Sequence, residues 1–496
     1  MTSNMLVADL INALQKRGLS PQLSPAQAQL LDMDLTRACF DSRRVNPGDI
    51  FCAIPGHSQQ GADFIQSALD AQASMLLVDQ VREQFNCPQL VVSDELALTA
   101  AHCADLLAGR PSSEIWCAAV TGTNGKTTVA HLLRGALQQL EIKAASCGTL
   151  GMIDLNGASP NLNTTPSADI VHCWLAGLVE AQCEAAIVEA SSHGIVQHRV
   201  AAVDFDCVAF TNLSHEHLDY HHTLEKYAAA KMQLINGLPS TAIAFVPHSK
   251  MLIDLCSSAE AEIMSWSSRD QQADVICKIT ESVNGVEVTF DWQQQHGVIN
   301  SEICGYHNGE NLFLAALMML AKGLSMSDVC SALSSQPAAD GRLEQVTVHQ
   351  GLAFVDYAHT PDAIAKVLTA LRASYPNRVL KVVFGAGGDR DNAKRKVMGR
   401  AVSDNADWCV LTSDNPRTES PESIINQVAA GIDENAVDFH SIVQRDDAIR
   451  FAVESLNSND VLIVAGKGHE TYQEINGVRH SFDDRLQILE AVQCLA

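Results

Sequence analysis

The 496-residue sequence lacks paired cysteines, long apolar runs and an excess of basic residues. Its 15 cysteines are scattered with no Cys-x-x-Cys spacing, which argues against a zinc ribbon or disulfide framework and favours reduced thiols in a cytoplasmic protein. No run reaches the roughly 18 apolar residues of a membrane span, and "MTSNMLVADLINALQKRG" resembles an amphipathic helix, not a signal peptide. Lysine and arginine number 33 against 58 acidic residues, a net charge of −25. We therefore expect neither a membrane nor a nucleic-acid partner.

The remaining composition is that of a folded chain, with 47% hydrophobic and 18% charged residues and no low-complexity tract. The length predicts about three domains. We expect an α/β protein with a small α/β domain over residues 1–98, a central parallel sheet covered by helices over 99–338, and a Rossmann-like domain over 339–496. The prediction of the central and C-terminal domains depends on apolar strands that end in polar loops, such as "IWCAAVTG", "AAIVEASSHG", "RVLKVVFGAGGDR" and "DVLIVAGKGHE". In such sheets, ligands bind at the carboxyl ends of the strands.

A glycine-rich loop, "GTNGKTT", follows the first strand of the central domain and precedes the helical pattern "TTVAHLLRGALQQL". Strand, glycine loop and helix start together form a phosphate cradle, because backbone N–H groups converge there. Lys126 can reach terminal phosphates, and the Thr127 hydroxyl can bind Mg²⁺. The alternative is a glycine-rich turn with an incidental lysine, which the Gly-Lys-Thr-Thr run disfavours. The loop is two residues shorter than the common P-loop, which indicates a distinct subclass.

That subclass resembles the Mur ligase superfamily, which includes the folylpolyglutamate synthases as distant members. The likeness covers all three domains and rests on these further motifs: "NLNTTPS" (161–167), "VEASSHGIVQHRV" (188–200), "FTNLSHEHLDYH" (210–221), "YAAAK" (227–231), "GYHNGENL" (305–312), "VDYAHTPDA" (355–363), "GAGGDRDNAKR" (385–395), "SDNPRTE" (413–419) and "AGKGHE" (465–470). The branch with these motifs implies ATP-dependent addition of meso-diaminopimelate to UDP-N-acetylmuramoyl-L-alanyl-D-glutamate through an acyl phosphate, in peptidoglycan synthesis. We expect a monomer with these small molecules as its partners.

The resemblance also implies the nucleotide and metal residues. The catalytic residues are expected to be Lys126, Glu189, His217 and Lys231. The expected ATP-binding residues are Gly122, Thr123, Asn124, Gly125, Lys126, Thr127, Thr128, Asn308, Arg342 and Asp356. Mg²⁺ is expected at Thr127, Glu189, His217 and Lys231, with Lys231 as a carbamate formed from CO₂. A surface helical lysine is the ordinary interpretation of Lys231 from the sequence alone, so its role depends on the resemblance.

Two further sets of residues are implied for the substrates. The UDP-sugar peptide is expected to contact Phe40, Ser42, His57, Ser58, Gln59, Asn163, Thr164, Thr165, Ser191, Gln197 and Arg199. Diaminopimelate is expected to contact Arg390, Asp414, Asn415, Pro416, Arg417, Gly466 and Glu470. Arg417 can hold a carboxylate through two parallel hydrogen bonds, which favours diaminopimelate over lysine.

Three other hypotheses follow from parts of the same motifs. The run "HEHLDYHH" (215–222) partly matches a dinuclear zinc pattern, but Tyr220 stands where a histidine is needed, and we expect His221 to be a loop residue. A folylpolyglutamate synthase-like ligase would share the nucleotide site but not "DNPR". A catalytically inactive nucleotide-binding protein is disfavoured because Lys126, Glu189, His217 and Lys231 are all present.

Overall fold

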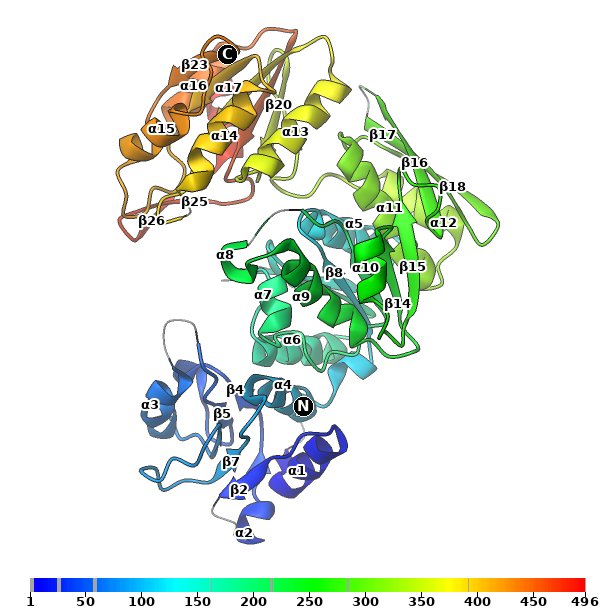
Figure 1. The fold of residues 1–496 in the computed structure, drawn as a ribbon, viewed down its shortest axis with the longest axis vertical. Helices are drawn as coiled ribbons and strands as arrows, with labels where there is room; N and C mark the ends of the chain where they lie inside the picture. The colour runs from blue at the N-terminus through cyan, green and yellow to red at the C-terminus, as the bar shows by residue number, and fades with distance from the viewer. Residues whose placement is uncertain are drawn as a thin grey trace. The chain divides into compact units, whose positions relative to one another are not determined.

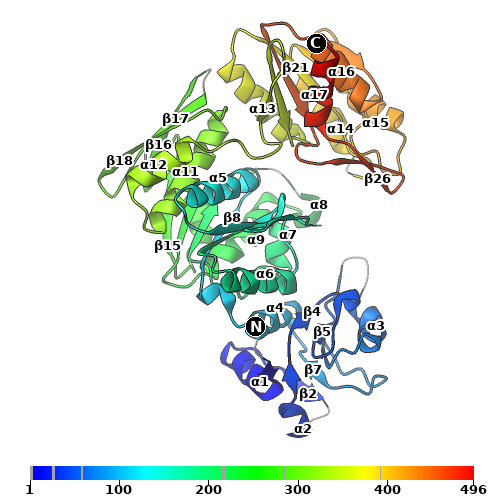
Figure 2. The same ribbon diagram turned by 180° about the vertical axis from the view of Figure 1, so that it is seen from behind.

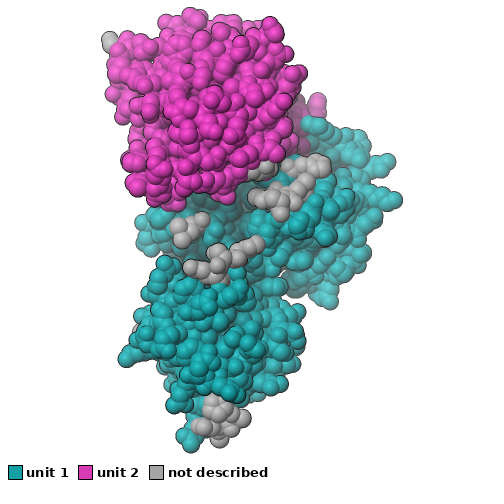
Figure 3. Space-filling model, turned by 60° about the vertical axis from the view of Figure 1, so that its left-hand side comes forward, with its two compact units in different colours: residues 1–275, 317–324 teal, residues 276–316, 325–496 magenta. Residues whose placement is uncertain are grey.

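The computed structural model describes residues 4–24, 28–56, 60–161, 163–214, 216, 218–282, 285–390 and 392–495. Contacts within it define two compact units (Figure 3). The first comprises residues 1–275 and 317–324, and the second comprises 276–316 and 325–496.

The first unit begins with a five-stranded sheet in the order β2-β7-β6-β5-β4 (Figure 1). Strands β4 to β7 run parallel, and β2 pairs antiparallel with β7. The elements of this part are β1 (Met5–Leu6), α1 (Val7–Lys16), β2 (Gln22–Ser24), α2 (Ala28–Leu31), β3 (Asp34–Leu35), β4 (Ala38–Cys39), β5 (Ile50–Cys52), α3 (Ile65–Asp70), β6 (Met75–Val78), β7 (Gln89–Val91) and α4 (Leu96–Leu107). Helices α1 and α4 bury their apolar faces against one side of the sheet, as the amphipathic pattern at the N-terminus predicts.

The larger sheet of the first unit has the strand order β11-β10-β9-β12-β8-β13-β14-β15. Its strands are β8 (Trp116–Thr121), β9 (Ala144–Gly148), β10 (Gly151–Asp154), β11 (Gly157–Ser159), β12 (Ala185–Glu189), β13 (Cys207–Phe210), β14 (Ile243–Pro247) and β15 (Glu262–Ser267). Its helices are α5 (Lys126–Gln139), α6 (Ala168–Glu180), α7 (Ser192–Val196), α8 (Leu218–His221), α9 (Leu224–Asn236) and α10 (Lys250–Leu255). Strands β9, β12, β8, β13, β14 and β15 are neighbours in this order and run parallel, whereas β10 pairs antiparallel with β9. Helices α6 and α9 cover one face, and Figure 2 shows α5 on the other.

The second unit contains an antiparallel meander, a six-stranded sheet and a separate hairpin. An antiparallel meander comprises β16 (Val275–Ser282), β17 (Gly285–Trp292) and β18 (Gln295–Ser301). The second sheet has the order β19-β20-β24-β21-β22-β23, with only β19 antiparallel among these six. Its strands are β19 (Glu344–Val346), β20 (Leu352–Asp356), β21 (Val379–Phe384), β22 (Trp408–Leu411), β23 (Asp438–Ser441) and β24 (Asp460–Ala465), and a separate hairpin joins β25 (Tyr472–Ile475) to β26 (Val478–Ser481).

The helices of the second unit lie on both faces of the six-stranded sheet and beside the antiparallel meander. They are α11 (Tyr306–Ala321, whose last residues belong to the first unit), α12 (Met326–Ser334), α13 (Pro361–Ser374), α14 (Ala393–Ser403), α15 (Pro421–Ala429), α16 (Arg445–Glu454) and α17 (Asp484–Cys494). Helices α13, α14 and α15 pack on one face, and α16 and α17 on the other. The predicted doubly covered, Rossmann-like sheet is confirmed.

The parallel α/β sheets and the predicted strands are therefore present. Within the described residues, no helix has both the length and the apolar character needed to cross a bilayer. The boundaries at residues 98 and 338 stay predictions, because the two compact units divide the chain elsewhere.

Candidate active site

The glycine loop lies between β8 and α5, in the strand–loop–helix order that the sequence predicts. Gly122 and Gly125 have φ angles of +133° and +89°, a region that favours glycine. At Gly122 a Cβ atom would lie 2.0 Å from the Thr211 hydroxyl, so no larger residue fits there. The loop is fixed from the end of the neighbouring strand β13, because Thr123 N–H donates to the Asn212 carbonyl (2.8 Å) and Asn124 N–H donates to the Asn212 side chain (3.1 Å).

Two lysines meet at this loop. Lys126 Nζ donates to the carbonyls of Gly122 (2.9 Å) and Thr123 (2.8 Å), and Lys231 Nζ also donates to the Gly122 carbonyl (2.8 Å). Lys231 is buried, 1% exposed, on α9. Burial, followed by the nearby Lys126 charge, holds the pKa of Lys231 well below the ordinary value. Lys231 is therefore not the solvated helical lysine that its sequence context alone suggests.

A carboxylate closes the other side of the loop. Glu189, the last residue of β12, is 2% exposed, and its Oε2 accepts from the Thr127 hydroxyl at 2.9 Å. Thr149 donates to the same carboxylate through its N–H (3.0 Å) and its hydroxyl (3.1 Å). Gly148 makes room for it, since a Cβ there would lie 1.9 Å from Glu189 Oε1. A hydroxyl and a carboxylate beside a phosphate loop are the hard oxygen donors that Mg²⁺ prefers.

The predicted peptide-binding residues of the central sheet are largely brought together around β12. Thr165 Oγ1 donates to the Glu189 carbonyl (2.7 Å) and contacts the Ser191 hydroxyl (3.0 Å). Arg199 donates to the Thr165 carbonyl (2.7 Å) and to Gln197. Thr164 joins the network through Thr149, at 3.1 Å, and Asn163 is exposed beside it. Polar groups therefore line the path from the Glu189 strand to Arg199.

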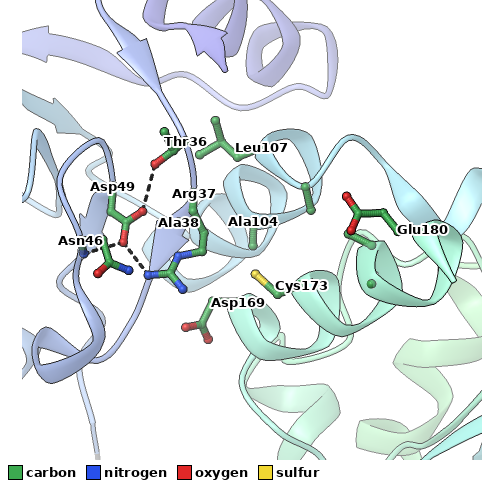
Figure 4. A pocket seen from close by; sticks show the side chains of 13 residues that line it. Thr36, Arg37, Ala38, Asn46, Asp49, Ala104, Leu107, Asp169, Cys173 and Glu180 are labelled. Carbon is green, nitrogen blue, oxygen red and sulfur yellow. Dashed lines mark hydrogen bonds and ion pairs between the residues drawn. The ribbon is translucent and has the colours of Figure 1, made fainter. Parts of the chain in front are cut away.

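The first sheet contacts this region through Phe40, whose N–H donates to Asp169 at the start of α6 (3.2 Å). Beside this contact lies a cavity of about 390 Å³ between the first sheet and α6. Figure 4 shows Arg37 in its wall, paired with Asp49 at 2.6 Å, with Asp169 and Cys173 across from it. Ser42 is buried in the short turn that follows Phe40. The structure thus places Phe40 next to α6, a helix that covers the central sheet.

Three expected nucleotide residues lie in the second unit. The Asn308 amide donates to the Cys304 carbonyl (2.8 Å) near the start of α11 and is 2% exposed. Asp356 ends β20, and its two oxygens accept from the N–H groups of Leu343 and Ala358, both at 2.7 Å. Arg342 stacks on the Tyr357 ring, with its guanidinium carbon 4.6 Å from the ring centre. Arg342 and Asp356 therefore share one edge of the six-stranded sheet.

The predicted amino-acid loops lie at the carboxyl ends of β21, β22 and β24. Arg417 has a φ of +50°, an uncommon backbone conformation for a non-glycine residue that is often found at functional sites. The hairpin β25–β26 holds it, because its N–H donates to Glu474 and its carbonyl accepts from Asn476. Its side chain reaches the Gly388 carbonyl, and Gly387 lies close to both Arg417 and Arg390. Arg390 itself is exposed.

The other residues expected to bind diaminopimelate lie in the loops after β22 and β24, and most of them are buried. Asp414, Asn415 and Pro416 are buried. A Cβ at Gly466, whose φ is +118°, would lie 2.5 Å from Asp414 Oδ2, so glycine lets the two loops approach. Glu470 accepts a hydrogen bond from the Asn415 amide at 2.8 Å.

Several residues that the sequence did not single out support these loops. Arg395 donates to both oxygens of Glu419 and to the Gly387 carbonyl, which ties the loop after β21 to the loop after β22. Arg445 and Asp484 form a fully buried ion pair with an N–O distance of 2.7 Å. Charged residues in helical patterns look like solvated surface in a sequence, and only their burial reveals this role.

Some predicted residues cannot be placed, and one expectation is wrong. His217, His57, Ser58 and Gln59 lie outside the described residues. The expectation that His221 is a loop residue is wrong: it ends α8, is 6% exposed and lies 3.0 Å from the Ser192 hydroxyl. In the described part of the chain, no three His, Cys, Asp or Glu side chains form a group that could hold a metal ion.

Comparison with known families accounts for most of the chain. The Mur ligase middle domain matches residues 120–319, the glutamate ligase domain of the Mur ligases matches 341–468, and the catalytic domain of the Mur ligase family matches 37–103. A UDP-N-acetylmuramoyl-L-alanyl-D-glutamate–2,6-diaminopimelate ligase from Chlorobium phaeobacteroides is 36% identical over 98% of this chain and 97% of its own length.

Solved structures show the same fold. One UDP-N-acetylmuramoyl-L-alanyl-D-glutamate–2,6-diaminopimelate ligase superposes with a TM-score of 0.69 at 32% identity, covering 95% of this chain and 98% of its own. A folylpolyglutamate synthase from Mycobacterium tuberculosis, solved with ADP and AMPPCP, has a TM-score of 0.62 at 18% identity. It covers 74% of this chain and 92% of its own.

Proposed function

The chain belongs to the Mur ligase family, and from that membership we propose that it is an ATP-dependent amide ligase that adds meso-2,6-diaminopimelate to UDP-N-acetylmuramoyl-L-alanyl-D-glutamate. The product is a peptidoglycan precursor. Relatives of this activity align with nearly the whole chain. The observation that carries the proposal is the arrangement around the glycine loop, where Lys126, Thr127, Glu189 and a buried Lys231 meet.

The reaction needs a carboxylate to become an electrophile. The γ-phosphoryl group of ATP passes to a carboxylate oxygen of the D-glutamate residue, which gives an acyl phosphate and ADP. The amine of diaminopimelate then attacks the acyl carbon, and inorganic phosphate and a proton leave as the amide forms. Lys126 is suited to follow the transferred phosphoryl group, because a lysine ammonium forms stronger, charge-assisted hydrogen bonds with phosphate oxygens than with backbone carbonyls such as those of Gly122 and Thr123.

The same residues fit Mg²⁺ with ATP. Thr127 and Glu189 would hold the ion together with His217, and when bound it draws negative charge from the phosphates. Thr149 and Gly148 keep the Glu189 carboxylate at this position.

We propose that Lys231 contributes as a carbamate. Its neutral amine would add to CO₂ and lose a proton, which converts a cation into an anion with two oxygens. The burial that lowers the pKa of Lys231 supports this step, since only the unprotonated amine reacts. A carbamate oxygen would also remove the like-charge contact between Lys231 and Lys126.

For the substrates, we propose that Asn308, Arg342 and Asp356 also bind ATP. Diaminopimelate would bind where Arg390 and Arg417 gather around Gly387, with Asp414 and Glu470 facing its ammonium group. The UDP-sugar peptide would extend from Phe40 and Ser42 to Arg199. We further propose a cytoplasmic monomer, without nucleic-acid or membrane partners.

The folylpolyglutamate alternative is less well supported. That neighbour covers 74% of this chain against 95% for the diaminopimelate ligase, and its identity of 18% supports the fold alone. The Arg417 loop also has the cation that a second carboxylate requires.

The decisive experiment measures ADP release by the purified protein with ATP, Mg²⁺ and the nucleotide-sugar peptide. We expect release to depend on meso-diaminopimelate, and mass spectrometry to find one diaminopimelate residue joined to the peptide. Lysine as the amine, and folate as the acceptor, are the matched controls. Equal turnover with lysine would refute the specificity, and turnover of folate alone would refute the proposed acceptor.

A further inference from the structure

Lys467 is a fully buried lysine in the second unit, with 0% of its side chain exposed. It follows β24 in the loop that also contains Gly466 and Glu470. Its Nζ lies 3.0 Å from Glu470 Oε2 and 3.1 Å from Asn415 Oδ1. An ammonium group this deep is costly unless its charge is paired, so its partners indicate its role.

The first consequence concerns the orientation of Asn415. Its Oδ1 accepts from Lys467 and from the Glu474 N–H (2.9 Å). Lysine has no acceptor, so the amide oxygen must face it, and the amide nitrogen must face Glu470 Oε2, 2.8 Å away. Lys467 and the Glu474 N–H together determine which way the Asn415 amide points.

The second consequence concerns Glu470. Both donors, Lys467 Nζ and Asn415 Nδ2, bind the same oxygen, Oε2. Among the described residues, no donor binds Oε1. Glu470 is thus held as a carboxylate with one oxygen committed to the protein and the other left for a ligand.

The third consequence is the net charge below the loops. Arg445 and Asp484 neutralise one another, with Arg445 also donating to the Ala465 carbonyl at 3.0 Å. Lys467 neutralises Glu470 in the same way. Asp414 makes no ion pair of its own among the described residues, although its charge also acts on Arg445, and its Oδ1 accepts from the Asn415 backbone N–H at 2.6 Å. Two cations against three carboxylates leave one negative charge, which suits one ammonium group of a ligand.

We propose that Lys467 is a positioning residue for the far end of the diamino acid. It orients Asn415 and Glu470 and cancels one of two neighbouring carboxylate charges, so that Asp414 and Glu470 Oε1 together accept one ammonium group. The inference rests on the proposed function. It makes Lys467 the residue that positions the acceptors of the ammonium group, while Arg417 recognises the carboxylate.

The test compares kinetic constants for Lys467→Met, a neutral side chain of similar length. We expect KM for diaminopimelate to rise at least about 10-fold, the loss of a charge-assisted hydrogen bond, with KM for ATP and for the nucleotide-sugar peptide unchanged. Lys381→Met is the matched control. Lys381 is a buried lysine of the same sheet that pairs with Asp460 at 2.8 Å, at the first residue of β24, and its loss should leave KM for diaminopimelate unchanged.

A double-mutant cycle separates positioning from packing. Glu470→Gln should raise KM for diaminopimelate, and adding Lys467→Met to it should have little further effect, because Lys467 acts through Glu470. This double variant removes both members of a buried pair, so it should fold even where Lys467→Met does not. Additive effects, an unchanged KM in Lys467→Met, or equal changes in all three KM values would overturn the inference. Absence of turnover in the unmodified protein would refute the proposed function instead.

Discussion

Gly148→Ala tests the position of the Glu189 carboxylate with one methyl group. The added Cβ would lie 1.9 Å from Glu189 Oε1, 2.3 Å from Cδ and 2.6 Å from Cγ. Non-bonded carbon contacts are ordinarily about 3.5 Å, so the carboxylate must move by about 1.5 Å. The backbone at position 148 does not require glycine, because the φ angle of Gly148 is not positive. The perturbation is therefore steric and directed at one side chain.

The displacement should cost activity more than stability. Moving the carboxylate breaks its hydrogen bonds to Thr127 and Thr149, each worth about 1 kcal/mol. The free energy of unfolding should thus fall by about 1–3 kcal/mol. A misplacement of about 1 Å in a catalytic group costs about 10²-fold in rate, so we expect kcat to fall by at least about 10²-fold.

The assay is ADP release at increasing Mg²⁺, together with thermal unfolding. Gly177→Ala is the control, because Gly177 lies in α6 of the same unit and a Cβ there meets no atom within 4 Å. That variant should keep wild-type kcat and gain about 0.5–1 kcal/mol of stability. Wild-type kcat in a folded Gly148→Ala protein would refute the assignment of Glu189 to the catalytic site.

Three other variants probe the rest of the molecule. Arg17 donates to His102 Nδ1 (2.7 Å). Burial, followed by the Arg17 charge, lowers the pKa of His102 to about 4. The stabilisation of the fold by neutral His102 is therefore present above pH 6.5 and is lost as the pH falls toward 4. His102→Asn keeps an acceptor without titrating, and urea unfolding should show a pH slope smaller by up to about 1.4 kcal/mol per unit in that window; equal slopes would contradict this. Arg417→Lys removes one of two parallel hydrogen bonds to a carboxylate, so the preference for diaminopimelate over lysine should fall about 10- to 100-fold in competition assays, and an unchanged preference would count against Arg417. Arg445→Met leaves Asp484 buried and unpaired, and should lower the free energy of unfolding by about 3–5 kcal/mol in urea titrations, where a loss below about 1 kcal/mol would show that the pair is not essential.

The sequence determined the strands, the phosphate loop and the family. Strands such as β8 and β24 are apolar throughout, because parallel strands are buried on both faces, and this makes them visible in one dimension. The loop after β8 is equally visible, since Gly122 and Gly125 are needed for its backbone and for its close approach to Thr211. Local conformation and burial of whole elements are properties that short stretches of sequence encode.

Only the tertiary structure decided how distant charges pair. Lys231 and Lys467 look like ordinary polar residues in the sequence, yet both are buried, and each is explained by a partner far along the chain, Gly122 and Asn415. The Arg445–Asp484 pair joins the first residues of two helices, which no periodicity reveals. The free energy of a buried charge depends on its neighbours in space, so the residues that support the candidate site could be identified only after the chain was folded.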